Sequence, residues 1–305
     1  MIPRLQLHVP VAPLSTFGIG STAEFFVDVN NPEDLVATVI AADQCRTMRY
    51  RVLASGSNIV FSDRPIRGLL IRFLGGKMQF DGDTCTVDAG VTLEKVIKGA
   101  IGVGLKGLET LSGIPGTIGG AIVGNAGAYG HSISEVLHQV EIWDGKSRRW
   151  ITRPECHFAY RHSVFKEESC LILRAWLRFS PGDAKALRKI SEDIVNLRLK
   201  KYKPGLRCPG SFFKNVLVQD VSPRSLPRID PARIIEGKIP AGYLLEQVGA
   251  NGMKEGGIEI AGFHGNLFFN RGGGTCAAVK HLALVLKSRV RRKFGIELEE
   301  EIRYF

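Results

Sequence analysis

The sequence predicts an α+β protein with about two domains, or three small ones. The chain has 305 residues, against roughly 150 for an average domain. Hydrophobic residues make up 44% of it and charged residues 23%, which is enough apolar material for globular cores and too much for a disordered chain. Strand patterns and amphipathic helix patterns occur together in three successive parts of the chain, the first ending near residue 75 and the second near residue 200.

The N-terminal part begins with an expected strand at 24–29. Asn31 is then a good N-cap, because Pro32 follows at the first helical position and two acidic residues stand in the first turn. The apolar stripe of that helix consists of Leu35, Val36, Val39 and Ile40. Short strands are expected next at 50–54, 59–61 and 69–73.

The middle part opens with an expected strand at 84–88 and a helix that runs from a Thr92 cap to Ile101. Further strands are expected at 136–143 and 171–179. Residues 183–200 have the spacing of an amphipathic helix. Its buried side is expected to carry Leu187, Ile190, Ile194 and Leu197.

The C-terminal part follows a segment, KKYKPGLRCPG (200–210), that is typical of a linker because it holds two prolines, two glycines and four basic residues. A short helix is expected at 240–248 and a long one from Thr275 to about Lys293. Strands are expected at 258–260, 266–269 and, last in the chain, 298–305.

The composition narrows the partners. Lysine and arginine total 41 against 30 acidic residues, a net charge of +11, which favours an anionic partner such as nucleic acid, an anionic membrane or a phosphorylated small molecule. The 35 glycines follow no repeat, which excludes collagen and indicates backbone lying close to something such as a cofactor.

Cysteine and histidine spacing indicates no metal site. The six cysteines include no CxxC pair and the seven histidines no HExxH or HxH motif. The N-terminus lacks the apolar segment of a signal peptide, and free thiols suit a reducing compartment, so we expect a cytoplasmic protein.

Three patterns in the sequence suggest a membrane span, a dinucleotide-binding motif and a nucleic-acid-binding surface, but each has a simpler explanation. Residues 110–130 carry no charge over a length that suits a membrane span, but seven glycines and Pro115 make a poor helix, so a glycine-rich loop packed on a ligand fits better. GVGLKG (102–107) and GIGSTA (18–23) have dinucleotide-motif glycine spacing without the required strand–helix context. The basic run at 287–293 would suit nucleic acid, yet it lies on a helix with an apolar side.

Four segments have compositions that are typical of ligand-binding or catalytic sites. ASGSN (54–58) lies between two expected strands, where backbone N–H groups can form an anion-binding nest, although a plain turn would also explain it. The loop at 112–130 is a candidate for a second nest along a flat cofactor. YRHSVF (160–165) puts an arginine among aromatic residues, and GSFFKN (210–215) follows the linker; alone, these would be an ion-pair partner and an ordinary strand.

Together these segments make the chain resemble the UDP-N-acetylenolpyruvoylglucosamine reductase (MurB) family. The resemblance runs from TFG (16–18) to LEEEI (298–302). Its most specific motifs are SGIPGTIGGAIVGNAGAYG, YRHSVF, GSFFKN and the terminal LEEEI. The departures from the family pattern remove no polar group that the family's chemistry uses; they are Ala54, Ser55, Gly124, Val216 and Glu300. The 50 residues from Arg161 to Ser211 match the family's shorter form, which lacks an extra loop with a substrate-closing tyrosine.

The resemblance implies an α+β FAD-binding fold of the vanillyl-alcohol-oxidase (PCMH) type, with two FAD-binding subdomains and a third, substrate-binding α+β subdomain. The implied FAD-binding subdomains span 1–75 and 76–200, and the substrate-binding one spans 201–293. The C-terminal strand, 294–305, is expected to join the second subdomain.

The resemblance also implies FAD as a non-covalent cofactor and NADPH as the hydride donor. The residues that it places on FAD belong to the 54–59 turn and to the glycine-rich loop. They are Ala54, Ser55, Gly56, Ser57, Asn58, Ile59, Gly113, Ile114, Pro115, Gly116, Gly119, Gly120, Ala121, Asn125, Ala126 and Gly127.

The implied reaction passes hydride from NADPH through FAD to the enolpyruvyl group of UDP-N-acetylglucosamine enolpyruvate, which becomes UDP-N-acetylmuramate for peptidoglycan synthesis. Arg161, a permanent cation with a planar fork, would polarise the substrate carboxylate. Ser211 would donate the proton, and Glu301 would stabilise the intermediate. The implied substrate contacts are Arg161, Lys214, Asn215 and His264.

These interpretations predict a monomer with no metal, no nucleic-acid partner and no membrane insertion. The excess of basic residues is then explained by three anionic ligands, FAD, NADPH and the UDP-sugar. The rival within the same fold is an oxidase with covalently attached flavin, for which His131 is the candidate attachment residue.

Overall fold

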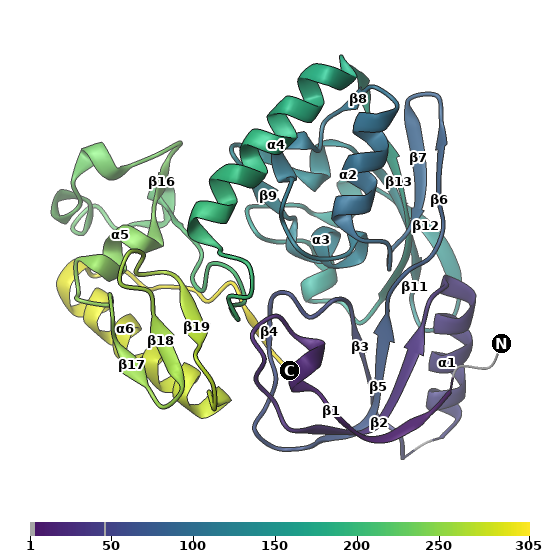
Figure 1. Cartoon of the computed structure of the whole chain (residues 1–305), viewed down its shortest axis with the longest axis horizontal. Helices are drawn as coiled ribbons and strands as arrows, with labels where there is room; N and C mark the ends of the chain where they lie inside the picture. Colours follow the sequence, from purple (N-terminus) through teal and green to yellow (C-terminus); the bar gives the residue numbers. More distant parts are fainter. Residues whose placement is uncertain (1–3, 46) are drawn as a thin grey trace. The chain divides into compact units, whose positions relative to one another are not determined.

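The computed structural model describes residues 4–45 and 47–305 (Figure 1). The chain folds into two compact units. Unit 1 holds the chain up to Val9, Ala23–Ser55 and Arg67–Lys203. Unit 2 is assembled from three separate stretches of sequence, Pro10–Thr22, Gly56–Ile66 and Pro204–Phe305.

Two sheets form most of unit 1. The first has the strand order β1-β2-β5-β3, with β3 parallel to β5, and the second has the antiparallel order β12-β11-β13-β7-β6. The strands of the first sheet are β1 (Gln6–Pro10), β2 (Thr22–Val29), β3 (Tyr50–Leu53) and β5 (Ile66–Phe73). Those of the second are β6 (Met78–Asp81), β7 (Thr84–Asp88), β11 (Leu137–Trp143), β12 (Arg148–Thr152) and β13 (Leu171–Arg178). Two-residue pairs add β8 (Leu105–Lys106) with β14 (Ser180–Pro181), and β9 (Gly127–Ala128) with β10 (His131–Ser132).

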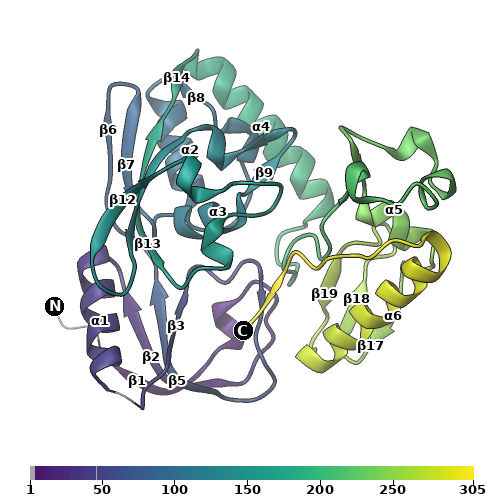
Figure 2. The same cartoon turned by 180° about the vertical axis from the view of Figure 1, so that it is seen from behind.

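Two helices of unit 1 begin at the N-caps that the sequence predicts. Asn31 Oδ1 accepts from the Asp34 N–H at 2.7 Å, and Thr92 Oγ1 accepts from the Lys95 N–H at 3.3 Å, so both predicted caps are confirmed. Figures 1 and 2 show α2, α3 and α4 on one side of the five-stranded sheet. The helices are α1 (Pro32–Gln44), α2 (Leu93–Gly102), α3 (Ile118–Gly124) and α4 (Ala184–Lys201).

The predicted loop at 110–130 therefore contains a short helix, α3, which the glycine content concealed. No helix within the described residues is long and apolar enough to cross a lipid bilayer.

The predicted amphipathic helix is confirmed as α4, but half of its expected buried face is wrong. Leu187 is 5% exposed, whereas Ile190 is 42% and Leu197 50% exposed. The face that packs includes Arg198, whose Nε donates to the Gly113 carbonyl at 3.1 Å. The packed face of α4 thus includes a polar contact to the glycine-rich loop, which hydrophobic spacing alone does not predict.

A cluster of charges ties β13 to its neighbours in unit 1. Arg174 donates to Asp88 at 2.8 Å, to Glu141 at 3.0 Å and to Glu33 at 2.6 Å. Asp88 and Glu141 are buried, at 3% and 7% exposure, and Asp88 also accepts from the Lys77 N–H at 2.8 Å. The hydrogen bond from Arg174 lowers the pKa of the Glu33 carboxyl below its usual value. Strand β13 is therefore joined both to its own sheet and to the start of α1.

Unit 2 packs a three-stranded antiparallel sheet with two helices, as Figure 2 shows. Its core includes Phe212 and Phe268, whose rings stack at 4.0 Å between centroids. Asp63 caps the long helix, since its carboxylate accepts from two N–H groups of the first turn at 2.7 and 2.9 Å. The helices are α5 (Ala241–Glu246) and α6 (Cys276–Phe294). The strands are β4 (Ile59–Val60), β15 (Val216–Leu217), β16 (Lys238–Ile239), β17 (Lys254–Glu255), β18 (Ile258–Ile260), β19 (Phe268–Asn270) and β20 (Arg303–Tyr304).

The C-terminal segment differs from its prediction. The final strand is the short β20, which pairs in parallel with β4 and belongs to unit 2 rather than to residues 76–200. Residues 299–301 bond instead to residues 212–214, so only the last few residues remain to extend along β4. The division into three subdomains stays a prediction.

Candidate active site

The ASGSN segment forms the turn that links β3 to β4. Gly56 has a φ of +68°, and a Cβ there would lie 1.9 Å from the Leu14 carbonyl oxygen, so only glycine fits. The Thr16 N–H donates to the Gly56 carbonyl at 3.2 Å, and Thr16 Oγ1 donates to the Ser57 carbonyl at 3.2 Å. The second half of the turn is therefore fixed against residues 14–16 of unit 2.

The glycine-rich loop reaches the first half of that turn within unit 1. Thr117 is 1% exposed and caps α3, since its Oγ1 accepts from the Gly120 N–H at 3.3 Å. A Cβ on Gly120 would lie 3.7 Å from the Cβ of Ala54, and one on Gly119 would lie 3.0 Å from the Cβ of Ala89. The structure thus brings together two segments that the sequence assigns to one cofactor.

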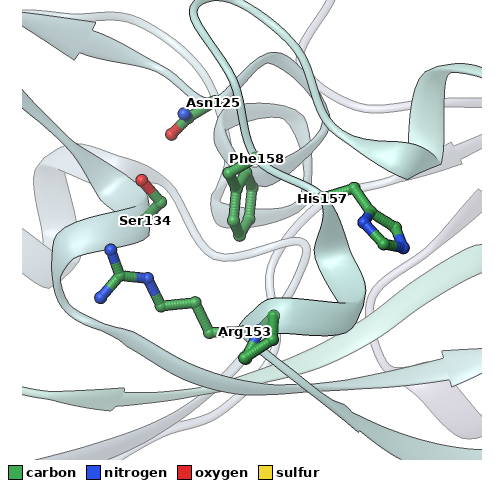
Figure 3. Close-up of a pocket in the computed structure, with 6 residues that line it drawn as sticks. Asn125, Ser134, Arg153, His157 and Phe158 are labelled. Carbon is green, nitrogen blue, oxygen red and sulfur yellow. The ribbon is translucent and has the colours of Figure 1, made fainter.

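Asn125 ends α3 in the left-handed region, at a φ of +42°. It is 8% exposed, its Nδ2 donates to the Ala159 carbonyl at 3.0 Å, and its Oδ1 is buried with no hydrogen-bond partner in the part of the chain that the structure describes. Figure 3 shows Asn125 at the border of a cavity of about 410 Å³. The other residues that line it are Ser134, Arg153, Pro154, His157 and Phe158. An unpaired buried acceptor suits a ligand that brings a donor.

Arg161 occupies a tight turn in unit 1, at a φ of +54° that is unfavourable for an arginine. Ala159 and His162 exchange two backbone hydrogen bonds of 3.1 Å around it. The Lys166 ammonium donates to the Arg161 carbonyl at 2.7 Å. The guanidinium lies over the ring of Tyr160, 5.5 Å from its centroid. The turn is thus closed around the arginine from several directions.

Two further bonds anchor this turn to α3. Asn125 holds the Ala159 carbonyl, and Ser163 Oγ donates to the Val123 carbonyl at 2.8 Å. Ser163 is fully buried. The sequence interpretation named neither Ser163 nor Lys166 as a functional residue, because a hydroxyl and an ammonium that bind backbone carry no spacing signal.

The segments that carry Ser211 and Glu301 are hydrogen-bonded to each other in unit 2, although the two residues are 90 positions apart in sequence. The Glu301 N–H donates to the carbonyl of Phe212, the residue after Ser211, at 2.8 Å. The Lys214 N–H donates to the Glu299 carbonyl at 2.9 Å, which continues the antiparallel pairing. The Asn58 side chain donates to the Glu301 carbonyl at 3.0 Å, so Glu301 is held on both sides of its backbone.

The remaining predicted substrate contacts lie in unit 2. Lys214 forms an ion pair with Glu299 and is 12% exposed in its side chain. Asn215 Oδ1 accepts from the N–H of Ala241, the first residue of α5, at 3.1 Å. His264 packs on Gly242 of the same helix, where an added Cβ would lie 2.6 Å from its Cε1. Asn215 and His264 therefore both contact α5.

The basic run of α6 makes contacts within unit 2. Lys287 pairs with Glu300 at 3.2 Å, Arg291 pairs with Glu297, and Lys293 donates to the Gln247 carbonyl at 2.6 Å. These bonds give three residues of the run partners within unit 2. Within residues 4–45 and 47–305, no group of three or more His, Cys, Asp or Glu residues is arranged to hold a metal ion.

The comparisons with known proteins agree with this geometry. Residues 23–152 match the family "FAD binding domain", and residues 202–305 match "UDP-N-acetylenolpyruvoylglucosamine reductase, C-terminal domain". A structure titled UDP-N-acetylenolpyruvylglucosamine reductase (MurB) from Thermus caldophilus aligns over 99% of both chains, with a TM-score of 0.77 and 26% identity. The predicted α+β FAD-binding fold is confirmed.

Full-length relatives carry the same name. The UDP-N-acetylenolpyruvoylglucosamine reductase of Solibacter usitatus is 41% identical over 99% of this chain and 98% of the relative. That of Carboxydothermus hydrogenoformans is 34% identical over 96% of this chain and 91% of the relative. The chain therefore belongs to the UDP-N-acetylenolpyruvoylglucosamine reductase family.

Proposed function

We propose that the chain reduces UDP-N-acetylglucosamine enolpyruvate to UDP-N-acetylmuramate, with NADPH as hydride donor and FAD as cofactor. The observation that carries the proposal is the backbone pairing that sets Ser211 beside the segment of Glu301. A hydroxyl and a carboxyl on two segments that are hydrogen-bonded to each other suit a reaction that needs one proton and one stabilised charge. We also propose that the protein acts in the cytoplasm, in peptidoglycan precursor synthesis, and as a monomer.

The residues present suit FAD. Ala54 and Gly120 lie together, and Asn125 offers an unpaired buried acceptor. The backbone N–H groups of the ASGSN turn are proposed to bind phosphate oxygens, as oriented backbone N–H groups do. In the glycine-rich loop the N–H groups of Gly119 and Ala121 already donate to the Ala89 and Thr117 carbonyls, so the loop is proposed to contribute close approach of uncharged backbone. The FAD contacts proposed are those named from the sequence, in 54–59 and 113–127. When bound, FAD supplies the chemistry of hydride transfer that no side chain has.

Arg161 is proposed to bind and polarise the substrate carboxylate. An enol ether accepts hydride poorly, because it is already rich in electrons. A guanidinium that spreads the added charge onto two carboxylate oxygens lowers this barrier, and its two parallel N–H donors match the carboxylate. The anchored turn supports this role, because a preorganised cation needs no rearrangement during the reaction.

Ser211 is proposed to donate the proton that completes the reduction. A carbanion-like intermediate is a strong base, so even a weakly acidic hydroxyl can protonate it. Glu301, whose backbone bonds to Phe212, is proposed to stabilise the same intermediate. Lys214, Asn215 and His264 are proposed to contact the anionic sugar nucleotide.

The test is an anaerobic half-reaction series on purified protein. We expect yellow protein that absorbs at about 450 nm and releases FAD into the supernatant on acid precipitation, as non-covalent flavin does. NADPH should bleach this absorbance, and UDP-N-acetylglucosamine enolpyruvate should restore it while gaining two hydrogens by mass. UDP-N-acetylglucosamine, which lacks the enolpyruvyl group, is the matched control. Protein that cannot be reconstituted with FAD, or that both sugars reoxidise equally slowly, contradicts the proposal. Yellow colour that stays in the pellet would instead favour covalent attachment.

A further inference from the structure

We propose that Asn266 is a positioning residue for this reaction: its side chain holds the backbone of Phe213 and thereby fixes Ser211 and Glu301. The inference rests on the proposed function, because it assigns a task in the same proton transfer. The sequence predicts Asn266 only as the first residue of a strand. In the structure it precedes β19 and is 3% exposed.

The side-chain amide of Asn266 makes the two hydrogen bonds to Phe213 that the backbone of a neighbouring strand would otherwise make. Its Oδ1 accepts from the Phe213 N–H at 2.8 Å, and its Nδ2 donates to the Phe213 carbonyl at 2.8 Å. Its own carbonyl accepts from the Phe212 N–H at 3.1 Å. A primary amide carries the same donor and acceptor as a peptide group, so it satisfies both polar groups of one buried residue.

The other edge of the same segment holds Glu301. The Phe212 carbonyl and the Lys214 N–H bond to residues 299–301, with Phe213 and Glu300 opposite each other as an antiparallel pair. Alternate residues of an extended segment point their N–H and C=O groups to opposite edges. Residues 212–214 therefore lie between the Asn266 amide and the Glu301 backbone, and movement at one edge reaches the other.

Packing leaves this segment little room to adjust. Phe212 is 0% and Phe213 1% exposed, and both rings contact Phe268, at 4.0 and 6.2 Å between centroids. Loss of the Asn266 donor would leave a buried carbonyl without its bond, and the segment would shift to recover one. Ser211 directly precedes Phe212, so that shift would reach the hydroxyl.

Unit 2 contains a matched control in Asn270. It is 4% exposed, and its Nδ2 donates to the Phe17 and Gly18 carbonyls at 3.1 and 3.0 Å. Its Oδ1 accepts from the Gly272 and Gly274 N–H groups at 2.9 and 3.1 Å. Asn270 is thus as buried and as fully bonded as Asn266, but none of these bonds reaches the Ser211 segment.

The test compares Asn266→Asp with Asn270→Asp in the FAD-loaded enzyme. Each change keeps the size of the side chain and replaces its donor with a second acceptor. For Asn266→Asp, we expect flavin reduction by NADPH to stay within about 3-fold, while reoxidation by the enolpyruvyl substrate slows about 100-fold, as a small misplacement of a reacting group does. For Asn270→Asp, we expect both half-reactions to keep their wild-type ratio even if the protein melts at a lower temperature.

Amide hydrogen exchange supplies a readout independent of activity. Asn266→Asp should accelerate exchange in 212–214 and 299–301, whereas Asn270→Asp should accelerate it in 272–274. If Asn266→Asp is not folded, Asn266→Ser, which keeps a hydroxyl donor, is compared in its place. Three outcomes would each overturn the inference. They are equal slowing of both half-reactions in Asn266→Asp, unchanged exchange at 299–301, and unfolding of both Asn266 variants while Asn270→Asp folds. A wild-type enzyme that the substrate fails to reoxidise would refute the proposed function instead.

Discussion

Replacement of Ser163 by alanine tests whether the anchored turn serves Arg161. Ser163 is fully buried and its hydroxyl donates to the Val123 carbonyl at 2.8 Å. The change leaves that carbonyl without its partner in a place that water reaches poorly, so it should cost about 1–3 kcal/mol of unfolding free energy. At about 2–4 °C per kcal/mol for a domain of this size, the melting temperature should fall by several degrees while the protein stays folded.

The activity should fall further than this stability loss explains. Ser163 and Asn125 hold the two ends of the turn on which Arg161 stands, and a displacement of about 1 Å costs on the order of 100-fold in rate. The assay measures melting temperature and substrate-driven reoxidation for Ser163→Ala and for Ser147→Ala. Ser147 is exposed and donates to Asp144 at 3.5 Å, so its replacement should be nearly neutral.

Two results would refute this reasoning. If Ser163→Ala melts lower but reoxidises at the wild-type rate, the hydroxyl supports the fold and the arginine does not depend on it. If both variants melt alike, the Ser163 bond contributes nothing measurable.

The remaining predictions concern the same reaction and the charge cluster of unit 1. Arg161→Lys keeps the charge but loses the paired donors, so most turnover should be lost while FAD stays bound; near wild-type turnover would remove Arg161 from carboxylate binding. Ser211→Ala should leave reduction by NADPH nearly unchanged and slow reoxidation by about 10²–10⁴-fold in rapid-mixing absorbance, and equal slowing of both steps would indicate a structural defect. Arg174→Met should lower unfolding free energy in urea by about 3–5 kcal/mol, because it strands the buried Asp88 carboxylate. The control Arg72→Met breaks a more exposed pair and should cost about 1 kcal/mol or less; equal losses would show that burial does not decide the difference.

Local chemistry made several elements predictable. Asn31 and Thr92 begin helices because their side chains bond to the N–H three residues on, and this depends only on nearby sequence. The catalytic candidates follow from the resemblance carried by YRHSVF, GSFFKN and LEEEI, and the structure has Ser211 and Glu301 on paired segments. The hydrophobic periodicity of the sequence carries no signal for a pairing between segments 90 positions apart, so composition and spacing alone do not predict it.

Elements that depend on distant contacts were harder to predict. The exposed Ile190 and Leu197 show that hydrophobic spacing gives a helix but not the face that packs, because Arg198 bonds to the glycine-rich loop. The final strand is shorter than expected because residues 299–301 bond elsewhere. In both cases polar bonds to a remote segment outweigh the preference of the local sequence.

The same physical reason explains why the roles proposed for Ser163 and Asn266 cannot be predicted from the sequence. Ser163 ties its own irregular segment to the Val123 carbonyl of α3, and Asn266 bonds to the irregular segment at 212–214. Where a segment lacks regular secondary structure, some of its hydrogen bonds must come from side chains. A helix or a strand can be predicted from the periodicity of its hydrophobic residues. A hydrogen bond from a side chain to remote backbone requires only one polar residue at one position and leaves no such pattern. In this enzyme the groups proposed for catalysis stand on irregular backbone, so the residues that hold that backbone are expected to govern the rate as strongly as the groups themselves.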